Sequence, residues 1–476
     1  MKLQRFALLS LLKQLTEHKL YLVGGAVRDH FLKIDNDDID IAIECNEAEL
    51  GELEQKLKEE YCVMHTQFFP NFGVLMVRFS ELDGVGKTPG YKVELTMTRT
   101  EMYRGKDRNP IVKPASILED LSRRDFTCNA IAYDLRNEVF LDPFNGVADI
   151  QGGILTPVPG NDNVFIDDPL RILRAFRFAQ KFGLRMSSTL TKRIRTDAAH
   201  LSWLSKERIH DELIKMAELK GFSESCRRMM DLGVLPLLLP KLNQLQFTYF
   251  PGAAAHKHMW AHTLTVVERI DAITNDPILK IAALLHDCGK PMTAQHMDGV
   301  TSFHRHEQVG AEHAAAILPL IGFGKKEIER ITNIINMHQL PVQVAEGKDK
   351  ALRRFVNKAG FYLEDLLTLA ECDYTTNNPT KQQACAQRIT DLRERIVQLQ
   401  EQDDYINFKL KLKGDRIAQL LEIERGPELG RVIAFLQALV LDGLINNDQT
   451  QLEQIVTHYK ESMYVKRRPE KQELIA

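Results

Sequence analysis

The chain has 476 residues, of which 44% are hydrophobic and 27% are charged, and its formal net charge is −3. This length favours about three domains, and the composition is typical of a water-soluble globular protein. The small net charge argues against a protein that coats nucleic acid through a generally basic surface. No segment reaches the roughly 18 uninterrupted apolar residues of a membrane span, so no membrane partner is expected.

The cysteines and the first residues bear on location. There are seven cysteines and none forms a C-x-x-C pair, which argues against a disulfide framework and against a zinc ribbon. A reducing cytoplasm is therefore the expected location. Charged residues follow the short apolar run from Phe6 to Leu12, so the start is expected to form an amphipathic helix rather than a secretory leader.

The order of elements divides the chain into two parts. Up to about residue 155, strand-like runs alternate with helical patterns, and the runs are YLVGG, IDIAI, FGVLMVRF, YKVELTMTR, NAIAYDL and EVFLDPF. Beyond residue 165 the pattern is helical, with one helix expected to stop at Gly183 and another to run from Ser205 to Gly221. The expected fold class is α+β, a mixed sheet with helices followed by an elongated all-helical body.

Two aspartates interrupt one of the strand-like runs. Asp38 and Asp40 are two residues apart, so in a strand their carboxylates would point to the same side. That arrangement suits a hard divalent cation, above all Mg²⁺ held jointly by protein and phosphate oxygens. Glu94, an acid in another strand-like run, is the candidate third carboxylate. The alternative is a turn with solvated acids.

The glycines just before the aspartates favour the metal-binding interpretation. Gly24 and Gly25 end one strand, and the helix that follows carries Arg28 in its first turn. Glycines at such a turn let backbone N–H groups approach a phosphate at a helix N-terminus, and Arg28 can add charge-assisted bonds. A triphosphate cradle followed by an acid pair is a nucleotidyl-transfer layout.

Five motifs in this order resemble the class II tRNA nucleotidyltransferase and poly(A) polymerase family. They cover about 190 residues and are VGGAVRD with DDIDIAI, EDLSRRDFTCNAIAYD, LDPFNGVADI, DDPLRILRAFRF and SKERIHDEL. The resemblance implies a polymerase-β-like catalytic domain that adds C, C and A to the 3′ end of tRNA from CTP and ATP. It further implies four domains: catalytic (1–155), nucleotide-selecting (156–225), HD-type (226–400) and a helical tail (401–476).

The resemblance also implies how the nucleotide is chosen without a nucleic-acid template. Asp168 and Arg171, expected on one helix, would pair with the base edge, since a carboxylate accepts from the exocyclic amine that C and A share. Arg174, one turn further, would reach the phosphates or the tRNA end. Arg124 would bind the triphosphate and Asp125 the ribose. Read without the family, the Arg-Arg-Asp run is a surface cluster.

Two features of this part raise questions. The family usually has Glu-Asp where this chain has Asp167-Asp168, so Asp167 has less reach to orient Arg171. Charged residues in the loop of residues 100–120 suit the flexible lever that in relatives couples the switch from C to A addition; they are Arg104, Lys106, Asp107 and Arg108.

One helix is expected to carry a local basic stripe. At about 100° per residue, four of its basic residues fall on one face: Arg171, Arg174, Arg177 and Lys181. The alternative is a solvated helix face, but interleaved phenylalanines indicate that the helix is half buried.

Nine of the fifteen histidines lie between His256 and His338. The string IAALLHDCGKP and its surroundings resemble an HD phosphohydrolase domain. The resemblance implies a metal site for Mn²⁺, Fe²⁺, Ni²⁺ or Zn²⁺, with the ligands His262, His286, Asp287 and Asp373. His306 and His338 would complete a second metal, although Arg305 replaces the usual glycine. The alternative is a degenerate HD fold with structural histidines.

The tail and the overall function leave alternatives open. Basic residues of the tail are candidate tRNA backbone contacts or plain surface charges: Lys411, Lys413, Arg416, Arg425 and Arg431. Rival functions are a bacterial poly(A) polymerase, a CC-only or A-only enzyme, an HD phosphohydrolase whose first domain docks RNA, and a tRNA-binding protein without activity. The sequence predicts no particular oligomeric state.

Overall fold

A computed structural model describes most of the chain, namely residues 9–10, 12–36, 39–60, 63–79, 92–102, 110–247, 258–298, 300–374, 376, 378–403 and 409–466. Its contacts form two compact units. The first comprises residues 1–249, 259–284 and 313–328, and the second comprises residues 250–258, 285–312 and 329–476. The four-domain division drawn from the sequence stays a prediction.

The first unit contains a seven-stranded sheet in the order β3-β4-β5-β2-β1-β8-β9. Its strands are β1 (Leu20–Val23), β2 (Ile39–Ile43), β3 (Val63–Phe69), β4 (Val74–Phe79), β5 (Lys92–Met97), β8 (Ala132–Asp134) and β9 (Val139–Leu141). Among these neighbours β2 and β5 are parallel, and the other pairs are antiparallel. The mixed sheet is confirmed, and each of the six strand-like runs contributes a strand.

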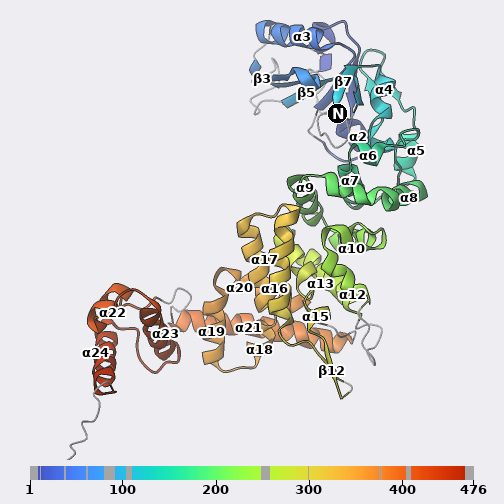
Figure 1. Cartoon of the computed structure of the whole chain (residues 1–476). Coiled ribbons are helices and arrows are strands. Elements are labelled where there is room, and N and C mark those ends of the chain that lie inside the picture. The colour runs from blue at the N-terminus through green and yellow to red at the C-terminus, as the bar shows by residue number, and fades with distance from the viewer. Residues whose placement is uncertain are drawn as a thin grey trace, which may run out of the picture. The chain divides into compact units, whose positions relative to one another are not determined.

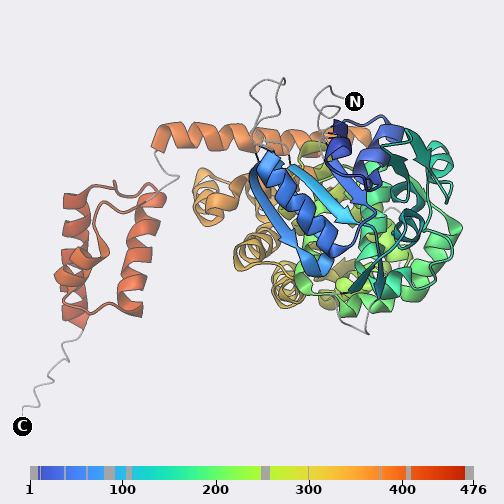
Figure 2. The same ribbon diagram turned by 90° about the horizontal axis from the view of Figure 1, so that it is seen from above.

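Alternation along β2 decides which of its side chains can reach a site. Ile39, Ile41 and Ile43 belong to an apolar core shared with α3 (Glu47–Glu60), which lies against the sheet (Figures 1 and 2). Ala42 belongs to a second core shared with α4 (Ile117–Ser122). Because alternate residues of a strand face opposite sides, Asp40 lies on the side of Ala42, away from the α3 core.

Helices dominate from residue 164 onward, as expected. The first unit continues with α6 (Val164–Asp167), α7 (Leu170–Phe182), α8 (Ser188–Asp197), α9 (Lys206–Ala217), α10 (Phe222–Asp231), α11 (Leu235–Leu238), α12 (Pro240–Phe247), α13 (Met259–Ile273) and most of α14 (Pro277–Leu285). α7 ends at Gly183, which has a φ of 64°. The expectation of one helix from Ser205 to Gly221 is wrong at its end: α9 stops at Ala217, and Gly221, with a φ of 84°, precedes α10.

The second unit is almost entirely helical. It includes part of α16 (His306–Ile317) and of α17 (Lys325–Met337), then α18 (Leu340–Ala345), α19 (Asp349–Ala359), α20 (Leu363–Cys372) and the 25-residue α21 (Pro379–Asp403), drawn in orange in Figure 2. Three tail helices share an apolar core of their own: α22 (Gly414–Leu421), α23 (Pro427–Leu441) and α24 (Gln449–Lys466). Among the described residues no helix is long and apolar enough to cross a membrane.

Candidate active site

The turn between β1 and α2 (Gly25–Leu32) is closely surrounded by side chains. Gly24 has a φ of 65°, a conformation that strains any residue with a side chain. A Cβ at this position would lie 3.2 Å from Asp40 Oδ2 and 3.8 Å from Arg124 Nη1. The glycine thus lets a carboxylate and a guanidinium approach the backbone at the start of a helix.

The two predicted acids that the structure describes lie side by side. Asp40 in β2 is in direct register with Glu94 in β5, and parallel register partners project to the same face of a sheet. Both are half-buried, and Thr96 Oγ1 donates to Glu94 Oε1 at 3.5 Å. Two oxygen donors on one face fit a hard divalent cation. Asp38 lies outside the described residues, so the predicted aspartate pair stays a prediction.

Arg28 is held from several sides. Its Nε donates to Asp29 Oδ1 at 2.7 Å, and its Nη1 donates to Asn129 Oδ1 at 2.8 Å. Its guanidinium also lies over the rings of Phe178 and Phe182, at 5.3 and 4.5 Å from their centroids. Arg28 is therefore a buried, fixed cation beside the glycine turn, and a phosphate would share it with these partners.

Asp125 connects this region to α7. Its Oδ1 accepts from Asn129 Nδ2 at 2.9 Å, and its Oδ2 accepts from Arg174 Nε at 2.9 Å. Burial alone would raise the pKa of Asp125, but the charges of Arg174 and Arg171 and the bond from Asn129 outweigh it and lower the pKa. Asp125 is an ionised, buried anchor for α7.

The base-selecting pair predicted on α7 is arranged differently from the expectation. Asp168 precedes the helix, with an extended φ of −140°, because the residue before a proline disfavours the helical conformation. Its carboxylate accepts from the Leu170 N–H at 3.2 Å and from Arg208 Nη2 at 3.0 Å. Arg171 is inside α7, and its Nη1 donates to the Val164 carbonyl at 3.4 Å. The expectation of one shared helix is wrong for Asp168.

The expected basic stripe on α7 is also largely neutralised. Arg174 pairs with Asp125, as described, and Arg177 Nε donates to Glu212 Oε2 at 2.6 Å. Arg171 is buried, whereas Lys181 is exposed. The four basic residues lie on α7 and the helix is half buried, as expected, but acids on other elements pair with two of its arginines.

A second group of polar residues lies in the second unit. Asp287 Oδ1 is 3.5 Å from His306 Nε2 and 3.8 Å from His338 Nε2, and the two Nε2 atoms are 3.3 Å apart. All three residues are buried. His306 Nδ1 lies 2.8 Å from the Phe303 carbonyl and His338 Nδ1 lies 2.7 Å from the Ile335 carbonyl.

These backbone contacts define the chemistry of the histidines. An Nδ1–H that donates to a carbonyl leaves the Nε2 lone pair for a metal, the usual arrangement at histidine metal sites. Two such lone pairs and a carboxylate oxygen converge within 4.8 Å of one another. Gln339 Nε2 also lies 3.3 Å from His306 Nε2. The donor set fits a divalent transition metal.

Two of the other HD candidates, His286 and Asp373, lie in the same unit as this group. His286 Nε2 is 3.3 Å from Asp287 Oδ2 and 3.7 Å from Asp373 Oδ1. Burial would lower the pKa of His286, but the charges of Asp287 and Asp373 prevail and raise it to about 10. Lys290 Nζ lies 2.6 Å from Asp287 Oδ2. His262 is buried in α13, which belongs to the first unit.

The absence of a side chain at Gly289 allows two segments of this cluster to pack closely. A Cβ on Gly289 would overlap the backbone carbonyl of His306 and lie 2.7 Å from the Gly310 nitrogen. The segment that carries His286 and Asp287 can thus pack directly on the first turn of α16. Arg305, at the position where the resemblance implies glycine, has a φ of 62°, a left-handed conformation that glycine adopts without strain.

Comparison with known families matches three parts of the chain. Residues 20–156 match the poly A polymerase head domain, residues 183–245 a probable RNA- and SrmB-binding site of polymerase A, and residues 259–400 the HD domain. The A-adding tRNA nucleotidyltransferase of Deinococcus radiodurans is 31% identical over 68% of this chain and 75% of its own length. The chain belongs to the tRNA nucleotidyltransferase and poly(A) polymerase family.

Other members of this family are similar over comparable lengths. The CC-adding tRNA nucleotidyltransferase of Thermus thermophilus is 29% identical over 70% of this chain and 75% of its own length. The multifunctional CCA protein of Teredinibacter turnerae is 28% identical over 74% of this chain and 79% of its own length.

Solved structures share this fold over most of the chain. The Bacillus stearothermophilus CCA-adding enzyme in complex with CTP aligns with a TM-score of 0.62 at 20% identity, covering 98% of this chain and all of that one. The Thermotoga maritima CCA-adding enzyme complexed with tRNA aligns with a TM-score of 0.59 at 21% identity and covers 96% of both chains.

Three residues that the structure places at the site are not among those predicted from the sequence. Asn129 bridges Arg28 to Asp125, Asp120 holds Arg124, and Arg208 pairs with Asp168. All three lie inside the sequence motifs that resemble the family, and this position in a motif is the signal that could have indicated them. Within the loop of residues 100–120, the structure describes residues 100–102 and 110–120, which include the paired strands β6 (Arg99–Met102) and β7 (Ile111–Pro114). The four charged residues of the predicted lever lie outside the described residues, so its role stays a prediction.

Proposed function

We propose that this protein adds C, C and A to the 3′ end of tRNA, using CTP and ATP and releasing pyrophosphate. The observation that carries the proposal is the joint position of Gly24, Asp40, Glu94 and Arg124: two acids in register beside a glycine turn that a guanidinium also approaches. The names of the relatives, A-adding, CC-adding and multifunctional CCA, define the reaction class. Cytoplasmic location follows from the cysteine pattern and this role.

Asp40 is proposed to hold Mg²⁺ together with Asp38, with Glu94 as the neighbouring acid. When bound, the ion would neutralise triphosphate charge and favour loss of a proton from the attacking 3′-hydroxyl. The chain's own contribution is positioning: the Gly24 turn presents backbone N–H groups at the α2 N-terminus, and Arg28 and Arg124 are the proposed phosphate partners.

Base selection is proposed for Asp168 and Arg171. Asp168 offers a carboxylate acceptor at the start of α7, and Arg208 and the Leu170 N–H fix its direction. C and A both carry an exocyclic amine that such an acceptor can bind, whereas U and G present other patterns at the corresponding edge. A base that leaves a buried polar group unpaired loses about 1–3 kcal/mol of binding.

Contact with tRNA is proposed for the helical body. Of the tail candidates, Arg416 pairs with Glu453 at 3.1 Å and Arg425 pairs with Asp415 at 2.5 Å. These two arginines are therefore weaker candidates than Lys411, Lys413 and Arg431, because a phosphate would have to displace an acid.

The test is incorporation of each labelled nucleotide into tRNAs that lack the terminal C-C-A, the terminal C-A or only the terminal A. We expect CMP on the first two and AMP on the third, and loss of all incorporation in Asp40→Asn. Asp35→Asn, an exposed aspartate five residues earlier, is the matched control and should behave like the unsubstituted protein. Incorporation that survives Asp40→Asn contradicts the metal assignment, and long A tails would identify a poly(A) polymerase.

A second function is favoured by the cluster of Asp287, His306 and His338. We propose that it binds a divalent metal such as Ni²⁺, Mn²⁺, Fe²⁺ or Zn²⁺ and hydrolyses phosphoesters, including 2′,3′-cyclic phosphates. His262, His286 and Asp373 are proposed as further ligands. The convergence of two Nε2 atoms, each with its Nδ1 against a carbonyl, supports this proposal.

Metal content and hydrolysis test this second function separately. The purified protein should retain a divalent metal, as measured by mass spectrometry, and should hydrolyse bis-p-nitrophenyl phosphate. His338→Gln should lower the metal content and the rate of hydrolysis. His296→Gln, at an exposed residue of the short strand β12 (Gln295–Met297), is the control. Full hydrolysis in His338→Gln, or an unsubstituted protein that binds none of the four metals, contradicts the proposal.

A further inference from the structure

We propose that Asp120 is a positioning residue for nucleotidyl transfer, because its carboxylate fixes the guanidinium of Arg124 beside the Gly24 turn. The inference rests on the proposed function and extends it to a residue outside the predicted set. Asp120 touches neither Gly24 nor the two acids in the contacts described here. It would act only through Arg124.

The carboxylate of Asp120 divides its two oxygens between two arginines. Oδ2 accepts from Arg124 Nη2 at 2.9 Å and from Arg124 Nε at 3.3 Å. Oδ1 accepts from Arg123 Nη2 at 2.6 Å and from Arg123 Nε at 3.1 Å. Asp120 is only 1% exposed, so this bidentate holding of two guanidinium groups occurs with little competition from water.

The remaining nitrogen of Arg124 points to the site. Its Nη1 donates to the Asn129 carbonyl at 3.1 Å and is the atom that approaches Gly24. With Nε and Nη2 on Asp120, the plane of the guanidinium is fixed and Nη1 is placed beside the turn. Loss of Asp120 would leave the side chain anchored through Nη1 alone.

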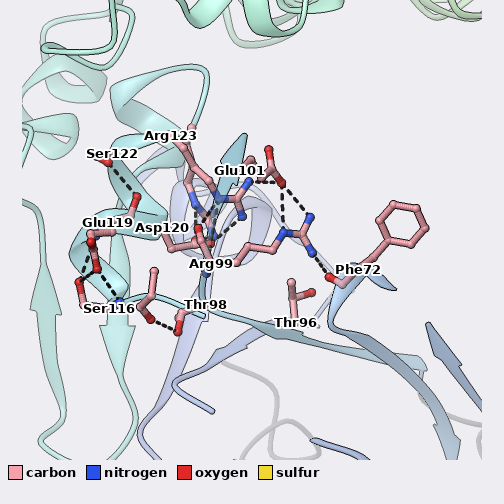
Figure 3. A network of polar contacts seen from close by, with 12 residues as sticks. Phe72, Thr96, Thr98, Arg99, Glu101, Ser116, Glu119, Asp120, Ser122 and Arg123 are labelled. Atoms are coloured by element: carbon pink, nitrogen blue, oxygen red, sulfur yellow. Dashed lines mark hydrogen bonds and ion pairs between the residues drawn. The ribbon is translucent and has the colours of Figure 1, made fainter. Parts of the chain in front are cut away.

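Arg123 ties the same carboxylate to the hairpin of β6 and β7, as Figure 3 shows. Arg123 Nη1 donates to Glu101 Oε1 at 2.7 Å, and Arg99 Nη2 donates to the same oxygen at 3.0 Å. The Arg99 N–H donates to Asp120 Oδ1 at 3.3 Å. Arg99 and Arg123 thus fix Oδ1 of Asp120 near the hairpin, while Oδ2 binds Arg124.

The charge balance of this group suits an anion. Three guanidinium groups, those of Arg99, Arg123 and Arg124, share the two carboxylates of Asp120 and Glu101, so a positive charge remains. Burial would raise the pKa of Asp120, but the charges of Arg124 and Arg123 lower it, so the carboxylate stays ionised. A triphosphate is the anion that the proposed function brings to Gly24.

CTP and ATP carry the same triphosphate, so the loss of a phosphate contact should affect both nucleotides equally. Asp120→Asn should raise KM by about 10-fold, the usual scale for charge-assisted hydrogen bonds. The factor should be the same for CTP and for ATP, and kcat should change by less than about threefold. Asp168→Asn, in contrast, should change the ratio between the two nucleotides.

Steady-state kinetics with a double-mutant comparison tests the inference. If Asp120 acts through Arg124, Asp120→Asn should add less than about twofold to KM in an Arg124→Lys background, because lysine cannot make the bidentate contact. Asp120→Glu keeps the charge but shifts the guanidinium, so it should recover only part of the loss. Glu119→Gln, an exposed acid one residue earlier, is the matched control and should keep the unsubstituted KM.

The outcomes separate the inference from the proposed function. Equal increases in KM for both nucleotides, absent in the Arg124→Lys background, support the positioning role. An unchanged KM in Asp120→Asn, or effects that add fully to those of Arg124→Lys, overturn it while incorporation by the unsubstituted protein still upholds the function. If Asp120→Asn does not fold, as judged by thermal unfolding, the charge-retaining Asp120→Glu decides in the same way. An unsubstituted protein that incorporates neither nucleotide refutes both.

Discussion

Asn129→Ala should destabilise the first unit and impair nucleotide transfer together. The side chain accepts from Arg28 at 2.8 Å and donates to Asp125 at 2.9 Å, and all three residues are buried. A hydrogen bond to a charged partner contributes about 1.5–3 kcal/mol. We take the lower value for each because Arg28 keeps Asp29 and Asp125 keeps another arginine, so the expected loss of unfolding free energy is about 3 kcal/mol.

Urea unfolding followed by tryptophan fluorescence measures this loss. Both tryptophans, Trp203 and Trp260, belong to the first unit, so the signal follows that unit. Transfer of CMP and AMP should fall in the same variant, because Arg28 and Asp125 would each lose one of the partners that fix their positions. The matched control is Asn137→Ala, whose amide bonds only to Asp134, at 2.9 Å, and which should lose about 1 kcal/mol and keep its transfer rate. A loss below about 1 kcal/mol in Asn129→Ala, with full transfer, would refute the reasoning.

Three further expectations concern pH, a buried ion pair and the HD cluster. The pKa of Asp125 is lowered in the folded protein, so its contribution to the free energy of unfolding is complete above the ordinary aspartate pKa of about 4 and is lost as the pH falls through the lower folded value. The urea midpoint should therefore decline less with falling pH in Asp125→Asn than in the unsubstituted protein. Lys280 is fully buried and pairs with Asp271, so Lys280→Met should cost about 3–5 kcal/mol in the same unfolding assay, and replacing both partners by apolar residues should recover most of it. Gly289→Ala would force a Cβ against the His306 carbonyl, so it should lower metal content by mass spectrometry, and full retention of metal would contradict the packing argument.

The strands were predicted best where one buried face requires apolar and polar residues to alternate. β5 has buried apolar residues on one face and polar residues on the other, which is the pattern that strands show when one face is packed. β2 has the same buried face, but its other face carries Asp40 and the buried Ala42. β3 was missed because its burial alternates poorly and it lies at the edge of the sheet. The short β6 and β7 pair only with each other among the described strands, and their charged residues resemble a loop.

The site was predictable as far as local motifs reach. The spacing of the glycines and acids indicated the turn and the carboxylates. The motifs contained the missed partners as well, but nothing local showed which distant residue each of them contacts. Asn129 lies 101 residues from Arg28, and Glu212 lies 35 residues from Arg177. The acidic partners of the basic residues on α7 were not predicted for this reason, because periodicity gives the face of a helix and not the acids that meet it.

The rings of Phe178 and Phe182 lie on the same helix as the proposed base-selecting Arg171, yet they pack beneath Arg28 from the glycine turn. A substitution of either ring on α7 therefore also removes support from the cation beside the glycine turn. Changes at these rings and at residue 28 should consequently have coupled, non-additive effects on nucleotide transfer.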